Sequence, residues 1–183
     1  MGIWQELRGR RSHLWLGLIA IALLLLNVTA QADDARLTAT VDYAKSGNTL
    51  ELLFELSPEL PVRTIRLAAI EAPDREQAPW GEQARKCLAD LSNEIIRLEV
   101  TASLPDAYNR LWAYGWLGQA SINQRSLAAG CTYLADPSES SSPYYRELLY
   151  AQEQARLLGL GIWSPTQPLR EPAAAFRGRS HSP

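Results

Sequence analysis

Two arginines and two carboxylates stand at the ends of expected strands, in a pattern suited to chemistry on a phosphodiester. Arg66 lies within an apolar strand that runs into Glu71-Ala72-Pro73-Asp74. The second arginine, Arg110, ends the segment Asp106-Ala107-Tyr108-Asn109-Arg110. Guanidinium groups bind phosphate through paired hydrogen bonds and neutralise charge that develops when a phosphodiester is attacked. The residue types therefore point to phosphoryl chemistry.

The distribution of histidine and cysteine excludes several other kinds of chemistry. The chain has two histidines, His13 near its start and His181 near its end, and none between them. A folded core between these two positions therefore has no histidine. This excludes nucleophilic triads, zinc sites and general bases that depend on histidine. Two cysteines are too few for a zinc site made of thiolates alone. An enzyme built from this sequence must use carboxylates, arginines, hydroxyls and a hard cation held by oxygen atoms.

Residues 1–32 have the composition of a secretory signal peptide. Three arginines near the start precede an apolar run over 14–26, and Ala30-Gln31-Ala32 offers a small-residue cleavage site. The alternative is an uncleaved anchor over 14–30, which is at the short end of the length needed to span a bilayer. Because the cleavage site is well placed, we expect a secreted or periplasmic protein without stable membrane association.

The remaining chain suits one domain over 33–163, followed by a disordered tail over 164–183 that is rich in proline and basic residues. Without the leader the chain has 15 Lys/Arg and 19 Asp/Glu, a formal net charge of −4. Contact with a nucleic acid must therefore be local, since long-range attraction is weak. We expect a monomer. Cys87 and Cys131 could form a disulfide or could be two small buried side chains.

Hydrophobic periodicity and turn residues predict five strands and three helices. A helix is expected between the third and fourth strands, and two more follow the fifth strand. This order fits an α+β fold built on a five-stranded antiparallel barrel of the OB type, with an open α+β sheet as the alternative. The expected strands are 37–41, 50–56, 64–70, 94–101 and 110–117, and the expected helices are 81–91, 121–130 and 143–158.

Taken in order, six segments of the chain resemble the landmarks of the staphylococcal nuclease-like (thermonuclease) family. They are Ser46-Gly47-Asn48-Thr49, the stretch from Ile65-Arg66-Leu67 to Asp74, Trp80-Gly81-Glu82-Gln83-Ala84, Asp106-Ala107-Tyr108-Asn109-Arg110, Ser121-Ile122-Asn123, and Gly159 to Trp163. Each motif alone is weak, but their order and spacing together identify the fold. The resemblance covers about residues 37–163.

The resemblance implies a nuclease site with one calcium ion. In the family two aspartates and a backbone carbonyl hold the ion, two arginines clamp the phosphate, and a glutamate activates the attacking water. Carried to this chain, the implied roles are phosphate clamping by Arg66 and Arg110, water activation by Asp74, metal binding by Asn48, Glu71 and the Ala72 carbonyl, and nucleotide contact by Tyr108.

Three of these positions depart from the family pattern. Asn48 and Glu71 each replace an aspartate, and Asp74 replaces a glutamate. The loss of one negative charge at Asn48 predicts weaker calcium binding, and the altered side-chain lengths can shift groups by about 1 Å, which costs on the order of 10²-fold in rate.

Two functions therefore compete at this point. The first is a calcium-dependent nuclease acting on single-stranded DNA or RNA, weakened by its altered metal position. The second is a non-catalytic OB-fold module that binds nucleic acid or protein and has lost the metal site. Catalysis is favoured because both arginines and two carboxylates are retained at the motif positions.

Overall fold

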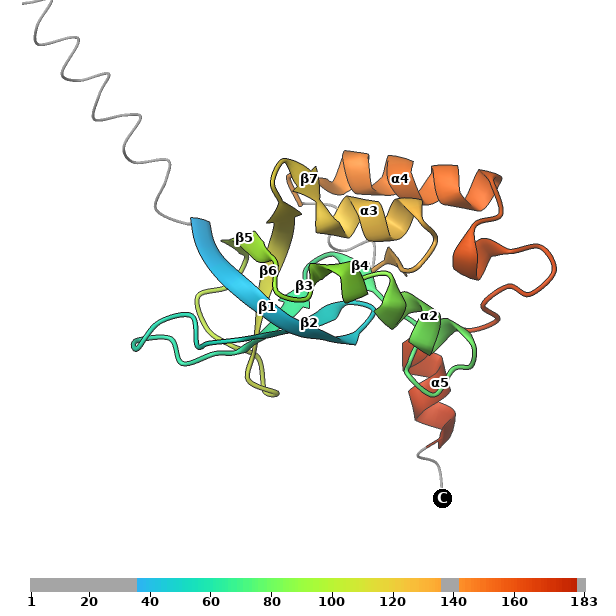
Figure 1. The fold of residues 1–183 in the computed structure, drawn as a ribbon. Coiled ribbons are helices and arrows are strands. Elements are labelled where there is room, and N and C mark those ends of the chain that lie inside the picture. Colours follow the sequence, from blue (N-terminus) through green and yellow to red (C-terminus); the bar gives the residue numbers. More distant parts are fainter. Residues whose placement is uncertain (1–35, 136–141, 181–183) are drawn as a thin grey trace, which may run out of the picture. The chain divides into compact units, whose positions relative to one another are not determined.

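The computed structural model describes residues 36–135 and 142–180 (Figure 1). The chain divides into two units, 1–36 and 37–183, and the account below concerns the second. The expected signal peptide and a serine-rich segment over 136–141 lie outside the described residues. Within the described part of the chain, no helix is both long and apolar enough to cross a membrane.

Five strands close into a barrel, in agreement with the expected OB-type fold. They are β1 (Arg36–Ser46), β2 (Thr49–Leu52), β3 (Thr64–Leu67), β5 (Ile95–Val100) and β6 (Arg110–Leu117). The hydrogen-bonded order is β3-β2-β1-β5-β6, and a further pairing of β3 with β6 closes the ring. That closing pair is parallel, with Arg66 opposite Trp112, so the expectation of a wholly antiparallel barrel is wrong. Closure rules out the open-sheet alternative.

Three two-residue strands complete the pairing. Strand β7 (Ala120–Ser121) extends the barrel sheet beside β6, and β4 (Ile70–Glu71) pairs with β8 (Tyr133–Leu134). The expected third strand over 64–70 is therefore split in two. Ala69 between the halves has a φ of 60°, a left-handed conformation that interrupts an extended strand. Because of this break, Glu71 leaves the barrel and lies beside Tyr133 instead.

Four α-helices are described, one more than expected. They are α2 (Trp80–Lys86), α3 (Ile122–Ala128), α4 (Tyr145–Leu157) and α5 (Ala173–Ser180). Figure 1 shows α3 and α4 side by side on one side of the barrel, with α5 beyond α2. The predicted cap at Ser121 is confirmed, since its hydroxyl accepts a hydrogen bond from the Gln124 N–H at 3.2 Å.

The fourth helix corrects an expectation about the C-terminus. Residues 164–183 were expected to be a disordered tail, yet Ala173–Ser180 form α5 and the Ala173 side chain is fully buried. The local sequence carries a helix signal, since three alanines follow Pro172, but the basic, proline-rich composition of the segment as a whole pointed to disorder. The contacts of this helix come from residues far away in the sequence, which sequence patterns do not reveal.

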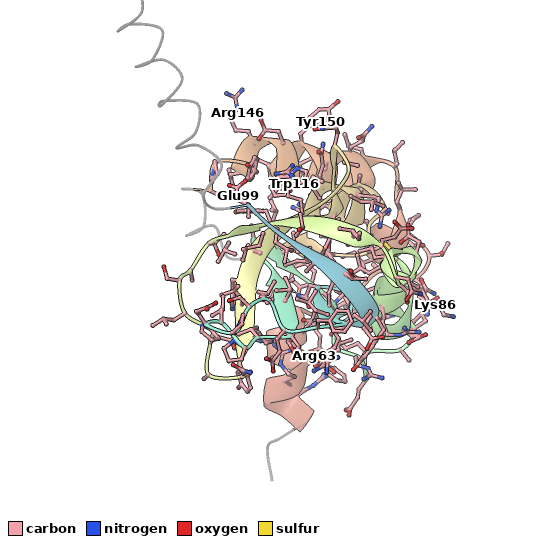
Figure 2. All side chains as sticks on the ribbon, turned by 60° about the vertical axis from the view of Figure 1, so that its left-hand side comes forward. Arg63, Lys86, Glu99, Trp116, Arg146 and Tyr150 are labelled. Atoms are coloured by element: carbon pink, nitrogen blue, oxygen red, sulfur yellow. A yellow bond between two sulfur atoms is a disulfide. The ribbon has the colours of Figure 1, made fainter. Side chains whose placement is uncertain are left out.

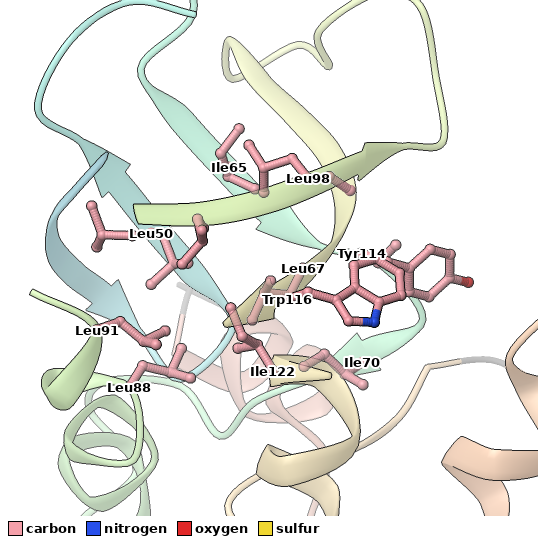
Figure 3. Packing of buried hydrophobic residues seen from close by; sticks show 14 of the residues in the cluster. Leu50, Ile65, Leu67, Ile70, Leu88, Leu91, Leu98, Tyr114, Trp116 and Ile122 are labelled. Atoms are coloured by element: carbon pink, nitrogen blue, oxygen red, sulfur yellow. The ribbon is translucent and has the colours of Figure 1, made fainter. Parts of the chain in front are cut away.

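Leucine, isoleucine and valine side chains fill the barrel, and aromatic residues join it to the helices. Leu50, Ile65 and Leu98 meet inside it, and all three are fully buried (Figure 3). Trp116 lies in edge contact with Tyr144, which precedes α4 (Figure 2). The side chains of Arg146 and Tyr150 point outward from α4 in the same view, so the opposite face of this helix covers the core.

A disulfide joins Cys87 to Cys131. Cys87 is the residue at the end of α2, and Cys131 follows the turn after α3, with a Cα–Cα distance of 6.5 Å. The two alternatives left open by the sequence are thereby resolved in favour of the bond. Close packing fixes the other end of α2, because a Cβ on Gly81 would come within 2.1 Å of the Asp74 carbonyl oxygen. Only glycine permits this approach.

Candidate active site

One cavity of about 840 Å³ gathers every residue to which the sequence analysis assigned a role. It opens where β2 and β3, the loop after β4, and the turn before β6 come together. The predicted residues that line it are Asn48, Arg66, Glu71, Ala72, Asp74, Tyr108 and Arg110. Their juxtaposition follows from the parallel pairing of β3 with β6, which places Thr64 opposite Arg110 and Arg66 opposite Trp112.

Arg66 is the most deeply placed charge in the cavity. The residue is 8% exposed, and its Nη2 donates to Glu71 Oε1 at 2.6 Å. The guanidinium lies over the ring of Trp112, 5.6 Å from the ring centre. Its Nε–H is buried and has no acceptor among the described residues. A buried donor without an acceptor is costly, so this arginine is a strong candidate for binding an anion.

Arg110 is held by a carboxylate at the start of its own motif. Asp106 Oδ2 accepts from Arg110 Nε at 2.8 Å and from Trp112 Nε1 at 3.1 Å. Its Oδ1 accepts from the backbone N–H groups of Tyr108 and Arg110. The Arg110 guanidinium also lies 5.0 Å from the centre of the Tyr108 ring. Asp106 thus fixes the direction of one arginine and the shape of the turn that carries it.

Burial acts to raise the pKa of Asp106, but the hydrogen bonds from Arg110, Trp112 and Tyr108 outweigh it and hold that pKa well below its ordinary value. Asp106 was not among the predicted site residues. The alternating spacing of Asp106, Tyr108 and Arg110 was the available signal, because an aspartate at the start of a turn commonly accepts from backbone groups two residues on.

Asp74 lines the cavity from the loop between β4 and α2. Its Oδ1 accepts from the Glu76 N–H at 3.1 Å, and its own N–H donates to Gln77 Oε1 at 2.7 Å. Its Oδ2 accepts from Arg177 Nη1 at 3.1 Å. Arg177 belongs to α5 and was not predicted as a site residue, because the tail that carries it was expected to be disordered.

The expected metal position provides oxygen ligands but little charge. Asn48 is buried, its Nδ2 donates to the Ile70 carbonyl at 3.3 Å, and its Oδ1 accepts from the hydroxyls of Ser46 and Thr49. Among the described residues there is no group of three or more His, Cys, Asp or Glu side chains that could hold a metal ion. Asn48, Glu71 and the Ala72 carbonyl provide oxygen atoms, which suit a hard cation. This donor set has one negative charge, on Glu71, and that carboxylate is already paired with Arg66.

The chain belongs to the staphylococcal nuclease family. The model of the family described as "Staphylococcal nuclease homologue" matches residues 64–165. The match includes Arg66, Glu71, Asp74 and Arg110, and it ends shortly after the 3₁₀ turn at Gly161–Trp163. This homology supports a nuclease function and a nucleic acid as substrate.

Curated relatives carry names in agreement with the family. An "Uncharacterized endonuclease" of Haemophilus influenzae is 30% identical over 153 residues, which are 83% of this chain and 80% of the relative. A "Thermonuclease" of Staphylococcus hyicus is 28% identical over 108 residues, 56% of this chain and 63% of the relative. The "SPbeta prophage-derived endonuclease YokF" of Bacillus subtilis is 27% identical over 132 residues, 68% of this chain but 43% of the relative. The chain thus spans less than two thirds of the last two proteins.

Proposed function

We propose that this protein hydrolyses phosphodiester bonds of single-stranded DNA or RNA in the cavity between β3, β6 and the loop after β4. The observation that carries the proposal is that the buried Nε–H of Arg66 has no hydrogen-bond acceptor among the described residues. Arg66 and Arg110 line the same cavity. A phosphate bound there would bring acceptor oxygens and negative charge to a site that has surplus donors.

In this proposal the two arginines bind the scissile phosphate and neutralise the charge that grows on its oxygens during attack. Asp74 accepts the proton of the attacking water, since its carboxylate lines the same cavity. Tyr108 is 78% exposed beside Arg110, so its ring offers a face on which a base can stack.

A calcium ion would be held by Glu71, the Ala72 carbonyl and Asn48. Such an ion supplies Lewis-acid neutralisation of the phosphate oxygens. Because the donor set has one carboxylate, we propose weak binding, near the ~10⁻⁴ to 10⁻³ M range of extracellular calcium modules.

We also propose that the protein acts outside the cytoplasm, after removal of residues 1–32. The disulfide supports this location, because such bonds persist in oxidising compartments and are rare in the cytosol.

The second candidate, a binding module without catalysis, is favoured by one observation. The Glu71 carboxylate is paired with Arg66 at 2.6 Å, and Asn48 adds no charge to offset that pairing at the metal position. In this alternative the cavity still binds a phosphate but never activates water.

Cleavage of a labelled single-stranded oligonucleotide tests the choice between these functions. The chain without its leader is assayed over calcium concentrations up to about 10 mM, which covers weak extracellular-type sites. Arg66→Ala should abolish cleavage, whereas Arg85→Ala should not, since Arg85 pairs with Glu82 on α2 and does not line the cavity. Equal activity of wild type and Arg66→Ala would refute the proposed site. Binding without cleavage at every calcium concentration would favour the module.

A further inference from the structure

Helix α5 brings a further arginine into the cavity from a segment outside the family match. Arg177 lies in the wall of the cavity that also contains Arg66 and Arg110, and its Nη1 donates to Asp74 Oδ2 at 3.1 Å. The family match ends at residue 165, so the segment with Arg177 lies beyond it. The side chain of Arg177 is 52% exposed, whereas that of Asp74 is 20% exposed.

The segment that carries Arg177 is held in place by several contacts with the barrel domain. Gln77, which is 7% exposed, donates through Nε2 to the Glu171 carbonyl at 3.1 Å. The Ala173 N–H donates to the Tyr133 hydroxyl at 2.9 Å, and the Ala173 side chain is fully buried. The Leu169 N–H donates to the Ile162 carbonyl at 2.8 Å. Arg177 is therefore presented to the cavity by an anchored helix.

The charges in the cavity suggest what Arg177 does. Besides Arg66 and Arg110, the wall contains Arg75 and Arg177, so four arginines face three carboxylates there, although the whole chain has a formal net charge of −2. The carboxylates are Glu71, Asp74 and Glu76. Two arginines suffice to clamp one phosphate, and a nucleic acid strand presents another phosphate at each neighbouring nucleotide. Arg177 stands beside Asp74, on the wall formed by the loop after β4, rather than in the Asp106 cluster that holds Arg110.

We propose that Arg177 binds a phosphate next to the scissile one and so positions the strand in the cavity. Arrival of the strand exchanges the Asp74–Arg177 pair for an Arg177–phosphate pair, which leaves Asp74 Oδ2 available to the attacking water. No covalent bond changes in this exchange. The inference rests on the proposed function and assigns to the C-terminal helix a substrate contact outside the matched domain.

A different role would give the opposite result. If the pair with Asp74 served to restrain the site, removal of Arg177 would raise the cleavage rate without weakening binding. If Arg177 binds a neighbouring phosphate, its removal weakens binding of any strand that contains that phosphate.

The test compares Arg177→Ala, Arg177→Lys and the control Arg179→Ala. Arg179 lies on the same helix, pairs with Glu171 and sits over Phe176, outside the cavity wall. Affinity for a labelled single-stranded oligonucleotide is measured in chelator, so that the strand stays intact, across a series of salt concentrations. We expect Arg177→Ala to bind on the order of tenfold more weakly. For Arg177→Ala, the slope of the logarithm of the binding constant against the logarithm of the salt concentration should be shallower by about 0.7. The Arg177→Lys variant keeps the positive charge and should have the slope of the wild type.

Substrate length provides the second readout. A dinucleoside monophosphate contains the scissile phosphate alone, so Arg177→Ala should raise KM for the oligonucleotide but not for the short substrate. An unchanged slope and affinity in Arg177→Ala, while the wild type binds and cleaves, would overturn the inference and leave the proposed function intact. A raised kcat with unchanged affinity would overturn it in favour of restraint. A wild type that neither binds nor cleaves would overturn both.

Discussion

Arg66 Nη2 lies 2.6 Å from Glu71 Oε1, so the deepest phosphate-binding candidate is paired with the carboxylate expected to bind the metal. The break at Ala69 makes this pairing possible, because it turns the chain back toward the residue five positions earlier. The pair keeps a buried guanidinium and a half-buried carboxylate mutually neutralised when the cavity holds no ligand. When ligands bind, a phosphate would neutralise Arg66 and a cation would neutralise Glu71 in place of this pairing.

Asn48→Asp should strengthen calcium binding and give it a clear thermal signature, because the substitution adds a second carboxylate to the proposed metal position. Without calcium the variant should be less stable by about 1–3 kcal/mol, because the Nδ2 donor to the Ile70 carbonyl is lost and a buried carboxylate faces that carbonyl. Calcium should then raise Tm with increasing concentration, since a ligand that binds only the folded state stabilises it. Thermal melts of both proteins in calcium, magnesium and chelator provide the measurement. If calcium leaves the Tm of the variant unchanged, Asn48 is not at a metal position.

Asp106→Asn should loosen Arg110 and destabilise the turn before β6 by about 1–3 kcal/mol near pH 7, the usual value of charge-assisted hydrogen bonds. The pKa of Asp106 lies below its ordinary value in the folded protein. The stabilisation is therefore present above the unfolded pKa of about 3.9 and is lost as the pH falls below it. The free energy of unfolding of both proteins is measured with denaturant at several pH values. The difference between wild type and variant should become smaller as the pH falls. Asp90→Asn serves as control, since Asp90 pairs with Arg125 at the surface.

Replacement of both cysteines, Cys87→Ala with Cys131→Ala, should lower the free energy of unfolding by about 2–4 kcal/mol. The bond closes a loop between positions 44 residues apart and so restricts the unfolded chain. Urea denaturation of the double variant, compared with wild type with and without reductant, measures the effect. Reduced wild type should match the double variant, and a variant as stable as the oxidised protein would contradict the prediction.

Tyr133→Phe should release the start of α5 without disturbing the barrel. The substitution removes the acceptor of the Ala173 N–H and keeps the ring. Hydrogen exchange of the amides of α5 should become faster, while exchange in β5 and β6 stays unchanged. Tyr145→Phe is a matched control, because Tyr145 begins α4 and does not contact α5 through any hydrogen bond described. Unaltered exchange in α5 would mean that Gln77 and the burial of Ala173 hold the helix alone.

The barrel was predictable because each strand carries its own apolar pattern. Strand β6 was expected at the bounds the structure gives, since its aromatic residues alternate between two sharp turn signals. The Ser121 cap was likewise visible in four consecutive residues. The predicted residues of the cavity were found from motifs, each of which lies within a few positions of sequence.

Features that depend on distant contacts could not be predicted. The parallel pairing of β3 with β6 joins residues more than 40 positions apart, and local patterns say nothing of strand direction. Helix α5 depends on Gln77, which is 94 residues before its partner Glu171, and on Tyr133. Arg177 was overlooked for the same reason, since a basic, proline-rich stretch is typical of disorder until its docking partners are known.

The disulfide has a consequence for the integrity of the molecule after proteolysis. The segment between Cys87 and Cys131 contains Arg110 and Asp106, whereas Arg66, Glu71 and Asp74 precede it. The turn over 101–109 lies inside that segment and exposes Leu104, whose accessible fraction is 77%. A protease that nicks this turn once would cut the chain between the two clamping arginines, yet the sulfur bridge would keep both fragments in one particle. In denaturing gel electrophoresis such a nicked protein would migrate as a single band without reductant and as two bands with it.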